Sequence, residues 1–175
     1  LNLTGSDHGD NLTGETNVNT ISGGIGDDTI NGDGGDDVLN GGAGSDTIYG
    51  NNDNDTINGG NDDDTLYGGS GNDTLNGNNN DDTLYGENDD DTLNGNNNND
   101  TLYGGSGNDT LNGNNNDDTL YGGGDDDILN GGSGVDILYG ESGSDTFDGG
   151  NNQDLIDLGL ADGVSDTVNL TSVSA

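Results

Sequence analysis

The 175-residue sequence contains no Cys, Pro, Met or Trp, and it sets 36 acidic residues against no Lys or Arg. Without cysteine the chain forms no disulfide, and without Lys or Arg nothing internal offsets the formal net charge of −36. The lack of basic residues also excludes nucleic acid as a partner, because phosphate binding needs them. No apolar run approaches the length that spans a bilayer, which excludes membrane insertion.

Apolar residues are scarce as well, at 23% of the chain. A conventional globular core is therefore excluded. Repulsion among the carboxylates favours an expanded chain, so burial alone is not expected to fold it. The sequence predicts that a cationic component must be supplied from outside.

What the chain does contain is a repeat. The eighteen residues from Gly68 to Tyr85 return letter for letter at Gly104 to Tyr121, and each half has the form G-x-x-x-x-D-x-U-x, where U is a large apolar residue. Counting in nines from Gly23 gives fifteen unbroken units that end at Asp157, each with Gly first, Asp sixth and an apolar residue eighth. A fixed period this short indicates a solenoid.

The units resemble the hemolysin-type calcium-binding repeat of RTX proteins, G-G-x-G-x-D-x-U-x. Gly23 to Asn31 (GGIGDDTIN) and Gly68 to Asn76 (GGSGNDTLN) match it fully. Asn, Asp or Glu often replaces Gly at the second and fourth positions, as at Asn78 and Asn80. Asn and Asp tolerate left-handed backbone best among non-glycine residues, so we expect the loop geometry to survive.

The apolar eighth position, between outward-facing seventh and ninth positions, predicts a strand of about three residues with one inward side chain. Two units then make one coil of eighteen residues. The ninth position agrees, because all six tyrosines are spaced by eighteen and alternate with asparagines at the same spacing. The predicted fold is all-β, a right-handed parallel β-roll (β-solenoid) with two short strands per coil, one carrying an outer Thr-x-Tyr ladder and the other Thr-x-Asn.

The resemblance implies that calcium lies between loops of successive coils on the same edge, bound by the sixth-position Asp of both loops and by alternating loop carbonyls. Hard oxygen ligands favour calcium over zinc or copper. Eight loops on one edge and seven on the other provide thirteen such spaces, and two degenerate units raise the expected number of calcium ions to about 13–15. The expected ligands are Asp10, Asp28, Asp37, Asp46, Asp55, Asp64, Asp73, Asp82, Asp91, Asp100, Asp109, Asp118, Asp127, Asp136, Asp145 and Asp154.

Three segments are expected. Residues 1–22 hold the degenerate units, with Asn19 in a sixth position, and form an amino-terminal cap; we expect His8 in its first loop to be solvated, with metal binding as the alternative. Residues 23–157 form the roll. In residues 158–175 the register breaks, and an apolar stretch that begins at Leu155 and runs to Leu170 supplies a carboxy-terminal lid.

The sequence therefore predicts a non-enzymatic, calcium-binding structural or adhesive segment of a secreted or cell-surface bacterial protein, which folds on extracellular calcium and uses type I secretion. Since the chain begins at Leu1 and shows no signal peptide, we expect it to belong to a longer protein. Two alternatives stay open: an ice-binding surface on the same roll, and a filament or surface-layer protein that self-associates through the Tyr or Asn ladder. The surface ligand is not predicted.

Overall fold

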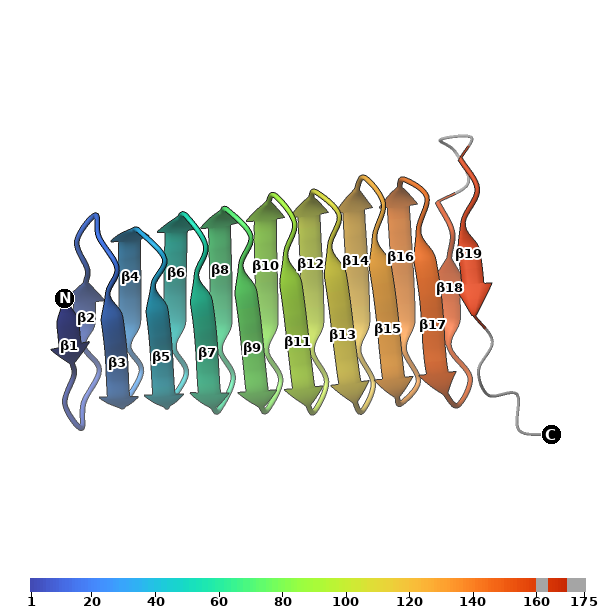
Figure 1. Ribbon diagram of the computed structural model, residues 1–175. Helices are drawn as coiled ribbons and strands as arrows, with labels where there is room; N and C mark the ends of the chain where they lie inside the picture. Colours follow the sequence, from blue (N-terminus) through green and yellow to red (C-terminus); the bar gives the residue numbers. More distant parts are fainter. Residues whose placement is uncertain (160–163, 170–175) are drawn as a thin grey trace.

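The computed structural model describes residues 1–159 and 164–169, and all regular structure in these ranges is β-strand. The strands form two parallel sheets, one built from the odd-numbered strands and the other from the even-numbered strands. Figure 1 shows the two sheets face to face, with their strands running in opposite directions and short loops at both edges. The chain is thus a parallel β-solenoid, as the repeat predicted.

The first sheet has ten strands in the order in which they occur along the chain. They are β1 (Asn2–Thr4), β3 (Thr20–Ile25), β5 (Val38–Ala43), β7 (Thr56–Asn61), β9 (Thr74–Asn79), β11 (Thr92–Asn97), β13 (Thr110–Asn115), β15 (Ile128–Ser133), β17 (Thr146–Asn151) and β19 (Thr167–Asn169). The second sheet has nine strands. They are β2 (Asn11–Thr13), β4 (Thr29–Gly34), β6 (Thr47–Asn52), β8 (Thr65–Ser70), β10 (Thr83–Asn88), β12 (Thr101–Ser106), β14 (Thr119–Gly124), β16 (Ile137–Ser142) and β18 (Leu155–Asp157).

The pairing register confirms the eighteen-residue coil. Between β10 and β12 the Cα partners are Thr83 with Thr101, Leu84 with Leu102 and Tyr85 with Tyr103. Residues at equivalent positions of successive coils therefore lie side by side along the solenoid. The last coil is longer: β19 pairs with β17 through Thr167 and Thr146, a separation of 21 residues, because three residues follow Asp157 outside the repeat.

Most strands are six residues long, twice the predicted length. Each runs from the seventh position of one unit to the third position of the next, as in Thr83–Asn88. Since side chains alternate between the two faces of a strand, the first-position glycine also points inward, and Gly86 is buried. Glycine has no side chain that would mark a position as inward-facing, so the apolar pattern missed half of each strand.

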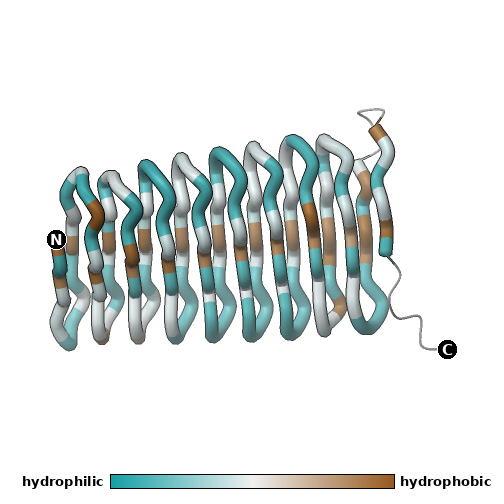
Figure 2. The backbone as a smooth tube through the Cα atoms, viewed as in Figure 1, coloured by the Kyte–Doolittle hydropathy of each residue, from teal (hydrophilic) through white to brown (hydrophobic). Residues whose placement is uncertain are grey.

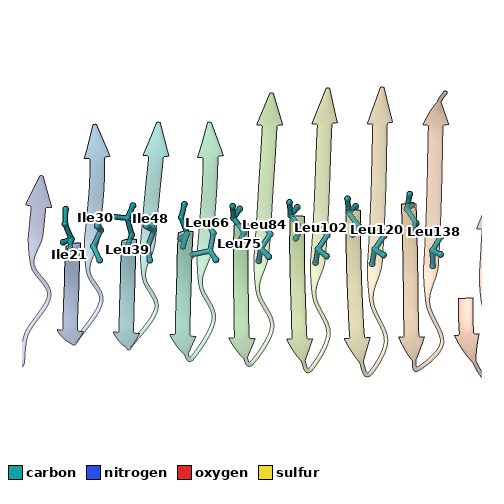
Figure 3. Close-up of a cluster of buried hydrophobic side chains, with 14 of the residues drawn as sticks. Ile21, Ile30, Leu39, Ile48, Leu66, Leu75, Leu84, Leu102, Leu120 and Leu138 are labelled. Carbon is teal, nitrogen blue, oxygen red and sulfur yellow. The ribbon is translucent and has the colours of Figure 1, made fainter. Parts of the chain in front are cut away.

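The core is a double row of eighth-position side chains, one row from each sheet (Figure 3). Figure 2 shows the same rows as regularly spaced hydrophobic bands in coils that are otherwise mostly hydrophilic or neutral. From Ile21 to Phe147 each of these side chains is 0% exposed, and each contributes roughly 1.5–3 kcal/mol through burial. Leu3, Leu12, Ile156 and Leu158 pack against the ends of the row. Between Ile21 and Phe147 the core thus consists of one large apolar residue per nine.

The outer faces carry the two predicted ladders. On the even-numbered sheet the rings from Tyr49 to Tyr139 stack with centroids 4.8–4.9 Å apart and interplanar angles of 4–8°. On the odd-numbered sheet the Asn94 side chain donates from Nδ2 to Asn76 Oδ1 at 3.1 Å, and its Oδ1 accepts from Asn112 Nδ2 at 3.0 Å. The structure adds a second asparagine ladder at the third position, in which Asn97 donates to Asn79 at 3.1 Å.

The loops turn through positive φ at the second and fourth positions, as at Asn78 (φ 84°) and Asn80 (φ 79°). The Asn78 side chain also donates to the Asn76 carbonyl oxygen at 3.1 Å. Asparagine thus replaces glycine in these loops and supplies an additional local hydrogen bond. Glu87 also lies at a second position and has a φ of 82°. Glutamate does not tolerate left-handed backbone as asparagine does, so the backbone is strained there.

Candidate metal centre

The sixth-position Asp side chains lie in two columns, one along each edge of the roll, where each loop enters the following strand. From Asp28 to Asp145 they are 0–2% exposed. Asp10 and Asp154, near the two ends, are half-buried. The structure therefore brings all the predicted ligands into the two columns and buries nearly all of them.

One oxygen of each carboxylate ties neighbouring coils together. The Asp91 amide donates to Asp109 Oδ1 at 2.8 Å, and the Asp109 amide donates to Asp127 Oδ1 at 2.8 Å. The carbonyl oxygen of Asp91 accepts from the Thr110 amide at 2.9 Å. Each aspartate thus continues the parallel hydrogen-bond pattern beyond the end of the strand.

The second oxygen is buried without a hydrogen-bond donor. For every sixth-position Asp from Asp28 to Asp136, no donor in the described part of the chain reaches Oδ2. In the loop of Asp109 this oxygen faces inward against the backbone: a Cβ built on Gly104 would lie 2.5 Å from Asp109 Oδ2 and 2.5 Å from the Gly122 carbonyl oxygen. The invariant first-position glycine is therefore what lets the carboxylate enter the coil. An unpaired buried carboxylate is strongly unfavourable and needs a compensating partner.

The electrostatics of the columns give the same result. Burial raises the pKa of these carboxyls, and neighbouring carboxylates raise it further, against the lowering effect of the amide hydrogen bond. The pKa rises to about 6 at Asp46, Asp73, Asp109 and Asp136, about 7 at Asp55, Asp100 and Asp118, and about 8 at Asp64, Asp82, Asp91 and Asp127. Burial thus disfavours the charged carboxylates of each column in the absence of a compensating cation.

The remaining loop acids behave differently. The fifth-position acids are exposed, and their hydrogen bonds run in the opposite direction along the roll. The backbone amide of the later coil donates to the side chain of the earlier coil, as when the Val135 amide donates to Asp117 Oδ1 at 2.8 Å. Fourth-position carboxylates also accept from the neighbouring coil, as when the Gly71 amide donates to Asp89 Oδ2 at 3.1 Å. These groups face water, which screens their charge. Among the loop acids of the described ranges, only those at the sixth position combine burial with an oxygen that lacks a hydrogen-bond donor.

The degenerate first coil supplies its own donors. Asp10 Oδ2 accepts from the Ser6 amide at 2.6 Å and the Ser6 hydroxyl at 2.9 Å, and these bonds lower the Asp10 pKa. His8 is exposed. The Asn19 side chain donates to the carbonyl oxygens of Glu15, Asn17 and Gly32 and to Asp37 Oδ1. From the sequence Asn19 was only a departure from the repeat, since nothing in the pattern indicates what its amide contacts.

This donor set fits a hard cation. Each loop offers one buried carboxylate oxygen, and the contacts of Asn19 locate loop carbonyl oxygens from two successive coils around one point. Calcium prefers six to eight oxygen ligands of this kind. Within residues 1–159 and 164–169 no three His, Cys, Asp or Glu side chains gather as a metal-binding group. Most ligands in a loop would therefore be backbone carbonyls, which also explains why a single Asp per unit suffices.

Comparison with known proteins agrees with these observations. The family model of the RTX calcium-binding nonapeptide repeat matches overlapping segments that together span residues 4–164. No curated protein matches the chain. In the described ranges no helix is long and apolar enough to cross a membrane. With its repeat, its parallel solenoid and this match over nearly its whole length, the chain belongs to the RTX calcium-binding nonapeptide-repeat family.

Proposed function

We propose that this chain is a calcium-dependent β-roll that folds when its aspartate columns are loaded with calcium. The observation that supports this most strongly is the row of buried Oδ2 atoms, from Asp28 to Asp136, that accept no hydrogen bond from the described residues. The proposed ligands are the sixth-position Asp residues from Asp28 to Asp154 and the loop carbonyls beside them. Asp10 is a further proposed ligand but a weaker one, because Ser6 already donates twice to its Oδ2.

The charge balance supports a large number of ions. About 13–15 calcium ions would add 26 to 30 positive charges to a chain of net charge −36, leaving −10 to −6. Extracellular calcium sites have dissociation constants of about 10⁻⁴–10⁻³ M. At tenfold excess over the dissociation constant each site stabilises the fold by ~1.4 kcal/mol, so thirteen sites provide roughly 18 kcal/mol.

The cellular role that fits this chemistry is a structural or adhesive segment of a secreted or cell-surface protein. Repeats of this family are typical of secreted bacterial proteins. In a cytosol with micromolar or lower calcium the sites would stay empty, and repulsion among 36 carboxylates would keep the chain unfolded for export by type I secretion. Outside the cell, millimolar calcium would fold each coil as it emerges and oppose backward movement.

The test combines circular dichroism with native mass spectrometry. In chelator at neutral pH the chain should give a disordered spectrum, and calcium should produce a cooperative change to β structure with about 13–15 ions bound. Magnesium at the same concentration should not replace calcium, because it requires a strict octahedral shell and keeps its waters. A β spectrum in chelator at neutral pH, or equal folding with magnesium, would refute the proposal.

A second candidate function is supported by the odd-numbered sheet, whose outer face carries a row of Thr beside two hydrogen-bonded asparagine ladders in constant register. A face with this regular spacing suits ice binding. Thermal hysteresis measured in calcium buffer would reveal it. Sedimentation of the calcium-loaded chain tests the third alternative, self-association through the Tyr or Asn ladder.

A further inference from the structure

Asn19 occupies the sixth position of the unit that begins at Gly14, where the fifteen units of the unbroken repeat have Asp. It is 1% exposed and makes the same backbone contacts as the aspartates. Its amide donates to Asp37 Oδ1 at 2.6 Å, and its carbonyl oxygen accepts from the Val38 amide at 3.0 Å. The loop is therefore built like the others, and only the side chain differs.

The difference lies in what the side-chain nitrogen contacts. Asn19 Nδ2 donates to the Glu15 carbonyl oxygen at 2.8 Å and to that of Asn17 at 2.5 Å, both within its own loop. From the next coil it contacts the Gly32 carbonyl oxygen at 3.3 Å and Asp37 Oδ1 at 2.9 Å. Its Oδ1 accepts from the Glu15 amide at 3.2 Å. A buried NH₂ group is thus surrounded by four oxygens, three carbonyls and one carboxylate.

Oxygens of this type, drawn from two successive loops, form the environment that the aspartate loops would offer to a cation. An amide nitrogen carries partial positive charge on its two protons, and it removes the negative charge that an aspartate would bring. We propose that the Asn19 amide takes the place of the cation in this loop, so that the loop closes without metal. The inference rests on the proposed calcium-dependent fold and reduces the number of loops that bind calcium. On this edge Asp37, and not Asn19, would be the first side chain to bind an ion.

The consequence is an asymmetric roll. On the edge that contains Asp37, the first loop would be stabilised by hydrogen-bond donors of the protein alone. Every later loop on that edge would require a bound ion. The largest expected number of bound calcium ions then falls from fifteen to fourteen, because the space between the loops of Asn19 and Asp37 takes none. The first coil also gives β5 a strand to pair with before calcium reaches the coils that follow.

The test is the number of ions that native mass spectrometry counts on the full chain at saturating calcium chloride. Asn19→Asp restores the carboxylate and should bind one ion more than the unaltered chain. Val18→Asp adds the same charge to the same loop at a side chain that is 62% exposed and should bind no additional ion. An unchanged count for Asn19→Asp, or an equal gain for Val18→Asp, would overturn the inference.

A second measurement uses the unaltered chain and stays informative if Asn19→Asp fails to fold. In the calcium-loaded protein the Asn19 side-chain protons should exchange with solvent on the order of tenfold or more slowly than those of exposed Asn17. Equal exchange rates would refute the role of the amide. If the unaltered chain neither binds calcium nor folds with it, the proposed function fails; if it does both and Asn19→Asp gains no ion, only this inference fails.

Discussion

Asp109→Ala is the substitution that tests specific coordination most directly. Asp109 is 1% exposed in the middle of the roll, and its Oδ1 accepts the Asp91 amide at 2.8 Å. Truncation leaves that amide buried without an acceptor, which costs about 1–3 kcal/mol. It also removes a proposed ligand from two neighbouring calcium sites, each of which would contribute ~1.4 kcal/mol at tenfold excess calcium. We expect a total loss of about 4–6 kcal/mol.

The loss can be converted into a calcium midpoint. If about eleven remaining ions bind as the chain folds, each doubling of free calcium supplies about 0.4 kcal/mol per site, or roughly 4.5 kcal/mol in all. Asp109→Ala should therefore raise the midpoint of a calcium titration, followed by far-ultraviolet circular dichroism, about twofold. The steepness of the transition should fall as well, because fewer ions take part.

Asp117→Ala is the matched control, since it removes the same charge from a neighbouring loop. The Asp117 side chain is exposed, and although its Oδ1 accepts from the Val135 amide, water can replace that bond. Its cost should stay within ~0.5 kcal/mol, which moves the midpoint by less than about 10%. Equal shifts for the two variants would mean that calcium screens diffuse charge, and the assignment of the sixth-position ligands would be wrong.

Three further predictions follow from the same geometry. In chelator, residual β structure should be highest below about pH 4 and should decline as the pH rises toward about 8, because burial raises the pKa of carboxyls such as Asp64 to about 8 and the folded chain holds protons that the unfolded chain releases. In calcium, the calcium concentration at the folding midpoint should rise as the pH falls, since protons compete for the same oxygens. If neither measurement depends on pH, both expectations are wrong. Leu102→Ala removes a 0% exposed core residue and should cost about 2–5 kcal/mol in a urea titration of the calcium-loaded chain, whereas Thr101→Ala beside it should cost far less. Truncation after Asp154 removes β18 and β19 and uncovers Leu138 and Phe147. This truncation should slow calcium-induced folding, measured by stopped-flow tyrosine fluorescence. An unchanged rate would show that the carboxy-terminal lid does not nucleate folding.

The coil, the core and the outer ladders could be predicted because the repeat is strict. An apolar residue every nine positions, with tyrosine and asparagine alternating at the ninth, permits one arrangement in which like residues stack, and the register of Leu84 with Leu102 confirms it. Positive φ at Asn78 and Asn80 was equally predictable, because few residue types tolerate that backbone. Local conformational preference and side-chain period were sufficient for these features.

The aspartate columns were predicted as far as their residues and their division between the two edges of the roll. The invariant sixth position singled out these Asp residues from the variable fifth position, but nothing in the sequence indicates that the sixth-position carboxylates are buried and the fifth-position acids exposed. Burial, the orientation of Oδ2 and the contacts of Asn19 depend on the coil eighteen residues away, and the extra strand length depends on glycines with no side chain to mark them. The period of the sequence thus determined the solenoid and its core. Only the stacking of coils decided which oxygens are left without a donor, because that depends on groups distant in sequence and adjacent in space.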